Sequence, residues 1–215
     1  MEPNRESDKR VIWIYVAVAL VLMFCCCAMV TAAAAGSWLA SWPFGWSSDR
    51  PFERSFGMGL GEERMDRTYR VGSEPRLVID NFAGSVTVRN GEEGEIRVIA
   101  VKEAPSARDL DRITIEVDER EGGLVIKTHK SQPLSNGSVR FEITAPANTD
   151  LNLHTGAGSA DVRGFRNNLS LDSGAGSLTI QDVTGKIDAI SGAGSISMRG
   201  VSGEVYAHSG AGSID

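Results

Sequence analysis

Outside one short segment the sequence contains no cysteine, because all three of its cysteines lie at residues 25–27. A disulfide framework is therefore excluded for the rest of the chain. Histidine is equally scarce, and His129, His154 and His208 are far apart in the sequence. Without a cluster of cysteine or histidine ligands, the sequence predicts no zinc site and no other metal-binding residues.

The chain also lacks an excess of basic residues. It has 22 lysines and arginines against 28 aspartates and glutamates, which gives a net charge of −6 at neutral pH. Its basic residues form no evident stripe along the sequence. Because nucleic acids and anionic lipid surfaces attract basic surfaces, we expect neither a nucleic-acid partner nor binding to anionic lipid.

Charge is missing altogether from the run that begins at Val11 and ends at Ala35. As an α-helix these 25 residues would be about 37 Å long, which exceeds the roughly 30 Å hydrocarbon core of a bilayer. Lys9 and Arg10 precede the run, and aromatic residues beginning with Trp38 follow it. This pattern is typical of a membrane-spanning helix whose N-terminus lies in the cytoplasm.

The expected organisation is therefore that of a single-pass protein of the cell membrane, with its C-terminal domain outside. Its parts are a cytoplasmic tail (1–10), a transmembrane helix acting as a signal anchor (11–35), a stalk (36–67) and an ectodomain (68–215). The alternative is a cleaved signal peptide, since residues 32–35 offer an Ala-x-Ala site. The apolar run is longer than the usual apolar region of such a peptide, which favours the anchor.

From Thr155 onward the sequence repeats every eighteen residues. Rows that start at Thr155, Ser173, Ser191 and Ser209 read TGAGSADVRGFRNNLSLD, SGAGSLTIQDVTGKIDAI, SGAGSISMRGVSGEVYAH and SGAGSID. A fixed short period is typical of repeat proteins whose units pack only on their neighbours.

Each full row contains two pairs of apolar residues, and one outward residue separates the members of each pair. This alternation is the period of a β-strand with one buried face, whereas the apolar spacing and the abundance of Gly and Ser disfavour a helix. The predicted fold is all-β: a right-handed parallel β-helix (β-solenoid) whose coils stack about 4.8 Å apart. The expected inward pairs are Ala160/Val162, Leu178/Ile180, Ile196/Met198, Leu169/Leu171, Ile187/Ala189 and Val205/Ala207.

The S-G-A-G-S corner between strands leaves two interpretations of its second serine. Ser159, Ser177, Ser195 and Ser213 could form a flat ladder that binds a ligand or ice, or their hydroxyls could satisfy backbone groups of the turn. We favour the second interpretation, because serine commonly does this in turns. Calcium binding is not expected, since apolar residues replace the aspartate of the G-G-x-G-x-D repeat.

Upstream, NFAGSVTV at residues 81–88 matches the first eight columns of a row, so we expect irregular coils to begin there. Residues 104–111 (APSARDLD) predict a short helix with Ser106 as its N-cap. The turn residues at 121–123 and 136–137 separate predicted strands. These strands cover residues 76–79, 85–88, 95–101, 112–117, 124–128, 138–144 and 150–153.

Residues 139–164 (VRFEITAPANTDLNLHTGAGSADVRG) contain an amphipathic strand, a proline, a short polar turn and the pattern h-x-h-x-T-x-x-G-x-h-x-h, where h is apolar. With RLVIDNFAGSVTVRN at residues 76–90, this segment resembles the bacterial β-strand-repeat family commonly labelled "putative adhesin". The resemblance covers roughly residues 67–215. It implies a right-handed parallel β-helix, often behind one membrane anchor, and it implies no catalytic or binding residue.

The sequence stops at Asp215, two residues into the first strand of a new row. This predicts a truncated solenoid whose last coil exposes an unpaired strand edge. Copies of the chain are then expected to self-associate through that open end.

These features favour a non-enzymatic, membrane-anchored module for surface adhesion or interaction with the cell envelope. Its partners would be the membrane, through residues 11–35, and an envelope polymer, a glycan or a protein; no cofactor is expected. The first alternative is a sensory or regulatory ectodomain of an envelope-stress system. Its ten-residue tail is too short for an output domain, so a partner would have to be engaged within the membrane.

The second alternative is a polysaccharide-acting β-helix enzyme, which would need clustered carboxylates. The repeats offer Asp161, Asp172, Asp182, Asp188 and Asp215. Asp161 and Asp215 share a column three coils apart, which separates them by about 14 Å and is too far for a carboxylate pair. The other three occupy different columns, so we expect no catalytic site.

Overall fold

The computed structural model describes residues 53–57, 60–120, 122–131 and 136–215, which belong to a unit spanning Asp49–Asp215. The expected tail, transmembrane helix and first part of the stalk lie outside these residues. Within the described residues, no helix has the length and apolar character needed to cross a membrane.

The described part of the chain is all-β apart from one four-residue helix. The elements in chain order are β1 (Glu53–Gly57), β2 (Leu60–Arg70), β3 (Arg76–Asn81), β4 (Val86–Asn90), β5 (Glu95–Ala104), α2 (Ala107–Leu110), β6 (Ile113–Arg120), β7 (Gly123–Lys130), β8 (Ser138–Ala145), β9 (Asp150–Ala157), β10 (Ala160–Arg163), β11 (Leu169–Ala175), β12 (Leu178–Gln181), β13 (Ile187–Ala193), β14 (Ile196–Arg199) and β15 (Val205–Ser209).

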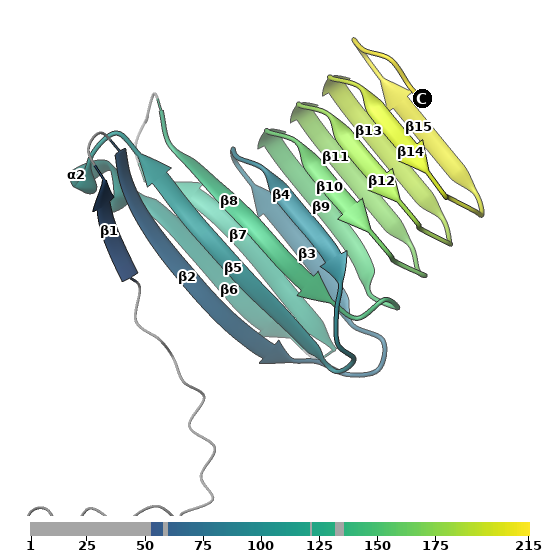
Figure 1. Cartoon of the computed structure of the whole chain (residues 1–215), viewed down its shortest axis with the longest axis horizontal. Coiled ribbons are helices and arrows are strands. Elements are labelled where there is room, and N and C mark those ends of the chain that lie inside the picture. Colours follow the sequence, from purple (N-terminus) through teal and green to yellow (C-terminus); the bar gives the residue numbers. More distant parts are fainter. Residues whose placement is uncertain (1–52, 58–59, 121, 132–135) are drawn as a thin grey trace, which may run out of the picture. The chain divides into compact units, whose positions relative to one another are not determined.

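The strands form two sheets that lie one behind the other (Figure 1). Sheet A has eight strands in the order β1-β2-β5-β8-β4-β10-β12-β14, and sheet B has seven in the order β15-β13-β11-β9-β3-β7-β6. The inner faces of both sheets supply one hydrophobic core, in which Phe141, Phe165 and Leu153 are fully buried. Because strand side chains alternate between faces, each inward residue has an outward neighbour on either side.

The eighteen-residue repeat is the hydrogen-bonding register of the C-terminal part. In sheet A, Ala160 pairs in parallel with Leu178, and Leu178 with Ile196. In sheet B, Leu169 pairs in parallel with Ile187. Each row therefore adds one strand to each sheet, and the structure confirms the predicted apolar columns. Burial decreases in the last row, where Val205 is 39% exposed, because fewer strands cover it.

The match at residues 81–88 is also confirmed. Asn81 pairs with Thr155 in sheet B, and Val86 pairs with Ala160 in sheet A, both in parallel and in the predicted alignment. Downstream, Ser106 caps α2: its hydroxyl accepts a hydrogen bond from the Asp109 amide at 3.3 Å. This is the predicted N-cap, although the helix is shorter than the predicted segment.

The first half departs from the expected run of irregular coils, because four of its strand pairs are antiparallel. These pairs are β1 with β2, β2 with β5, β5 with β8, and β6 with β7. The physical reason is clearest for β6 and β7, which a very short turn containing Gly122 (φ 80°) joins into a hairpin, and a hairpin is antiparallel. β2 begins at Leu60, within the expected stalk, and its Met65 is buried in the core.

One column of inward residues at the corner is polar. This inner polar column runs through consecutive strands and consists of Thr128, Asn81, Thr155, Ser173, Ser191 and Ser209. Ser173, Ser191 and Ser209 donate hydrogen bonds to the carbonyls of Gly158, Gly176 and Gly194 at 3.2, 3.0 and 2.8 Å.

The corner role that the sequence suggested for the second serine of S-G-A-G-S thus belongs mainly to the first serine. The second serine of each corner lies on the outer side: Ser159, Ser177 and Ser213 are exposed. The sequence interpretation assigned the right chemistry mainly to the wrong serine, because both positions are serine in the corners that begin at Ser173, Ser191 and Ser209 and only their side of the strand differs.

Candidate functional site

The outer face of sheet A brings together four arginines from β4, β5, β10 and β14. Thr144 of β8 pairs with Arg97 of β5 on one side and with Arg89 of β4 on the other. Arg89 pairs with Arg163 of β10, and Gln181 of β12 separates Arg163 from Arg199 of β14. We call Arg97, Arg89, Arg163 and Arg199 the arginine row. It crosses the strands, which are spaced about 4.8 Å apart, so Arg97 and Arg199 are separated by about 24 Å.

Two members of the row are held by neighbouring carboxylates. Arg97 makes a two-pronged contact with Asp66 of β2, with Nε–Oδ1 and Nη2–Oδ2 distances of 2.9 and 2.7 Å. Arg163 does the same with Asp161 on its own strand, with both distances 2.6 Å. The side-chain hydrogen bonds, aided by the charge of each aspartate, raise the pKa of both arginines above the ordinary value. Both guanidinium groups therefore stay charged and have fixed orientations.

The other two arginines carry no such partner. Arg89 and Arg199 are exposed, and neither forms an ion pair with any residue that the structure describes. Their guanidinium donors remain available to a ligand. Arg89 also lies directly opposite Arg163, and like charges at such positions destabilise a sheet unless other charges compensate.

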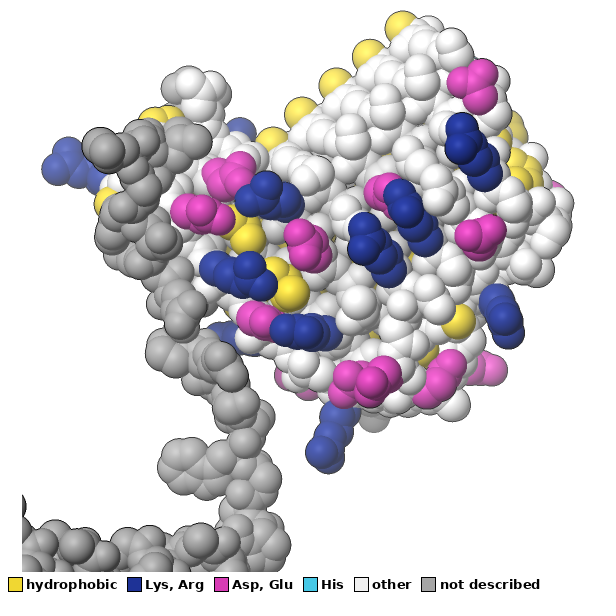
Figure 2. Space-filling model, in the orientation of Figure 1, with side chains coloured by type: hydrophobic (Ala, Val, Ile, Leu, Met, Phe, Trp, Pro, Cys, Tyr) yellow, Lys and Arg dark blue, Asp and Glu magenta, His cyan; other side chains and the backbone are white. Residues whose placement is uncertain are grey.

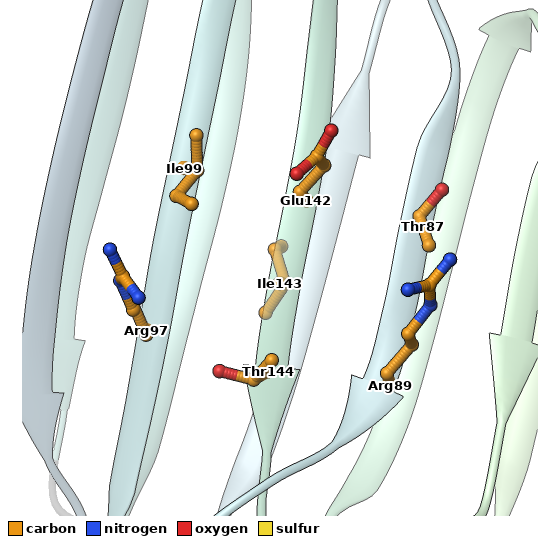
Figure 3. Close-up of a pocket in the computed structure, with 7 residues that line it drawn as sticks. All are labelled: Thr87, Arg89, Arg97, Ile99, Glu142, Ile143 and Thr144. Atoms are coloured by element: carbon orange, nitrogen blue, oxygen red, sulfur yellow. The ribbon is translucent and has the colours of Figure 1, made fainter.

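A shallow depression with a volume of about 210 Å³ lies at one end of the row. Figure 3 shows the guanidinium groups of Arg97 and Arg89 on its two sides, with Glu142 and Thr144 between them on β8. Ile143, whose side chain points into the core, lies between them on the same strand and also lines the depression. The full lining is Thr87, Arg89, Arg97, Ile99, Glu142, Ile143 and Thr144.

Acidic and basic side chains are interleaved on this face (Figure 2). The column of outward residues next to the arginine row contains Asp66, Glu142 and Asp161. The face is therefore polar and only mildly positive along the row itself, rather than a dense cationic patch.

The sequence did not predict the arginine row. Part of it could have been found, because Arg163, Gln181 and Arg199 occupy the ninth position of successive rows and Arg89 occupies the matching position of the upstream segment. Arg97 could not, since it joins the row through antiparallel strands whose register no repeat reveals.

The five aspartates that the sequence offered for an enzyme do not converge on one site, although Asp172 and Asp188 lie on the neighbouring strands β11 and β13. Asp161 lies on the outer face of sheet A and pairs with Arg163. Asp172 and Asp188 lie on sheet B, where Asp172 is 3.2 Å from Nδ1 of His154. Asp182 occupies a turn with a φ of 53°, and Asp215 bonds to β14 through its backbone.

The histidines are likewise placed apart. His154 contacts Asp172, and His129 lies 3.5 Å from Glu116, both on the outer face of sheet B. Among the residues that the structure describes, no group of three or more His, Cys, Asp or Glu side chains could hold a metal ion.

No protein-family model matches the chain, and no curated protein matches it. Solved structures that resemble it include a "putative cell adhesion protein" from Clostridium sporogenes, at 12% identity and a TM-score of 0.48, covering 70% of this chain and 97% of that one. A "putative adhesin" from Bacteroides fragilis aligns at 12% identity and a TM-score of 0.27, covering 70% of this chain and 95% of that one. Both names match the expected family, but likenesses this distant assign neither family nor function to the chain.

Proposed function

We propose that the protein is a non-enzymatic binding module, anchored in the membrane and exposed outside the cell, that attaches to a cell surface or to the envelope through the outer face of sheet A. The observation that carries the proposal is the arginine row, which crosses six neighbouring strands of one sheet. Such an extended, shallow face suits a large ligand that lies on the surface, whereas small substrates are usually enclosed by deeper pockets.

The proposed architecture behind this face is a right-handed parallel β-helix over the repeats. Two observations support it: equivalent strands pair in parallel at a spacing of eighteen residues in both sheets, and each full row alternates between the sheets. A coil of this kind can lengthen the face by one strand per row without changing its side-chain pattern.

A non-enzymatic role is supported by where the carboxylates lie. A hydrolytic pair needs two carboxyl groups within about 10 Å on either side of the scissile bond. Here Asp161 lies on sheet A, whereas Asp172 and Asp188 lie on neighbouring strands of sheet B, where the Asp172 carboxylate is held 3.2 Å from Nδ1 of His154. The Asp161 carboxylate, moreover, is occupied by Arg163.

The test is adhesion of cells that express the full chain. We expect such cells to bind immobilised envelope material, including peptidoglycan and purified glycans, more than cells without the protein do. Protease added outside intact cells should abolish this binding and release a fragment that begins before β2. Unchanged adhesion after complete release of that fragment would refute the proposal, and a mature N-terminus near residue 36 would refute the anchor.

A further inference from the structure

We propose that the arginine row binds a linear carbohydrate polymer with regularly spaced anionic groups, carboxylates or phosphates, which lies across the strands of sheet A. This inference rests on the proposed function and names the chemical class of its ligand.

The geometry of the row favours a linear ligand. The positions follow the stacking direction of the strands, so contacts recur in steps of about 4.8 Å or its double. Arg89 and Arg199, the two arginines with free donors, are three strand intervals apart, about 14 Å. A flexible polymer several sugar units long can contact both, whereas one small anion cannot.

The chemistry of the row favours an anionic ligand. Arginine presents a planar fork of donors that matches carboxylate and phosphate groups. Asp66 and Asp161 already occupy the forks of Arg97 and Arg163. Those two ion pairs are polar groups of fixed orientation within the row. Arg89 and Arg199 supply the positive charge that a ligand would neutralise.

The neighbouring side chains favour a carbohydrate over a nucleic acid. Thr87, Thr144 and Gln181 can donate and accept hydrogen bonds, and the exposed Glu142 carboxylate can accept them from sugar hydroxyls. The depression has no aromatic residue in its lining, whereas single-stranded nucleic acids are typically bound by stacking on aromatic rings. A polymer that combines anionic groups with many hydroxyls fits this combination.

The experiment measures binding of the full chain, purified in a non-ionic detergent, to four immobilised polymers. Polygalacturonate carries carboxylates, poly(glycerol phosphate) carries phosphates, dextran is neutral, and oligothymidylate represents single-stranded nucleic acid. We expect binding to at least one of the first two that weakens as salt is added, and no binding to dextran. The first two probes distinguish the carboxylate source from the phosphate source.

The variants test whether the row is the site. The double substitution Arg89→Gln with Arg199→Gln should weaken binding to the anionic carbohydrate about tenfold, since two exposed ionic contacts are lost. The matched control is Arg76→Gln with Arg166→Gln, which removes the same charge at exposed positions outside the row. The control should bind as the parent chain does, and both doubles should keep the parent melting temperature because all four side chains are exposed.

Three results would overturn the inference: equal loss of binding in the two double variants, tighter binding to oligothymidylate than to either anionic carbohydrate, or no binding to either carbohydrate. These failures are distinguishable from failure of the proposed function. If expressing cells adhere but the polymers do not bind, only the ligand class is wrong. If the polymers bind but the cells do not adhere, the adhesive role is wrong.

Discussion

The described structure has two halves, the strands before residue 150 and the repeats from residue 155 onward, and both contribute to one core. The strands of the two halves are paired in different ways. In the repeats, parallel neighbours lie eighteen residues apart, and the strands of sheet A are four residues long. In the first half, β2 and β5 are eleven and ten residues long and pair antiparallel, with Glu63 opposite Lys102. Both halves bury alternating apolar residues, so the core alone does not decide the direction of pairing.

The difference lies in the connections. Each repeat passes from sheet B to sheet A at a glycine-rich corner, and the close backbone contacts there leave no room for a side chain on the glycines. The first half instead uses hairpin turns and long strands, and only some of its glycines, such as Gly84, lie as close to a neighbouring backbone. Substitutions at comparable positions should therefore have unequal effects in the two halves.

The largest expected effect comes from a charge in the core of the repeats. Ile180 is fully buried between β10 and β14, and Ile180→Asp would place an unpaired carboxylate there, at a cost of more than about 4 kcal/mol. We expect hydrogen exchange to show loss of protection in β10, β12 and β14, with better retention in β2 and β5.

Thr179→Asp is the control, because the neighbouring side chain faces outward and is only partly buried. It should change the free energy of unfolding by less than about 1 kcal/mol. If denaturant titration gave similar losses for both substitutions, the assignment of inner and outer columns in the repeats would be wrong.

The next largest effect should come from a corner glycine. Gly176 has a φ of 154°, and a Cβ added to it would collide with the backbone carbonyl of Gly158 in the preceding row. Gly176→Ala should therefore destabilise the protein by about 3 kcal/mol, since that backbone cannot shift without disturbing the stack.

Gly94, in the first half, is the control for Gly176, because it also has a positive φ but has open space around it. Its φ is 80°, but a Cβ there would meet no atom within 4 Å. Gly94→Ala should cost only the conformational penalty, about 1 kcal/mol. Equal melting temperatures for the two alanine variants would show that the corners are less constrained than we infer.

The sequence predicts the repeats better than the first half for a physical reason. A period of eighteen residues determines both the alternation and the partner of each strand, so Leu178 must face Ala160 and Ile196. In the first half, alternation still predicts strands, but an alternating strand can pair in either direction. The antiparallel order of β2, β5 and β8 depends on tertiary packing, which no local pattern encodes.

The candidate site could likewise be predicted only where its residues follow the repeat pattern. Three of the four arginines in the row come from matching positions of the repeat pattern, and the fourth, Arg97, reaches the row by antiparallel pairing. The sequence did not predict the inner polar column for another reason. The two serines of one corner are chemically identical, and only the alternation of side chains along the strand determines which of them is buried.

A third prediction concerns Asn81 of β3, the junction residue that pairs with Thr155 where the first half meets the repeats. The buried Asn81 donates from Nδ2 to the carbonyl oxygen of Val139 at 3.0 Å, and its Oδ1 accepts from the Thr128 hydroxyl at 2.9 Å. Asn81→Leu would leave both partners buried without that bond, which should cost about 2 kcal/mol in thermal or denaturant unfolding. Asn152→Leu, on the exposed face of β9, should be nearly neutral, and a comparable loss there would argue against a specific role for the junction.

The smallest effect should separate the two serines of one corner. Ser191 is fully buried, and its hydroxyl donates to the carbonyl oxygen of Gly176 at 3.0 Å. Ser191→Ala should cost about 1 kcal/mol, because that carbonyl loses a hydrogen bond at a site with little access to water. Ser195 lies on the outer side, where its hydroxyl accepts only a long bond of 3.4 Å from the Ser213 amide. Ser195→Ala should therefore leave the melting temperature unchanged. A larger loss at Ser195 than at Ser191 would restore the original interpretation, in which the second serine stabilises the corner, and would make the inner polar column incidental to the stacking of the repeats.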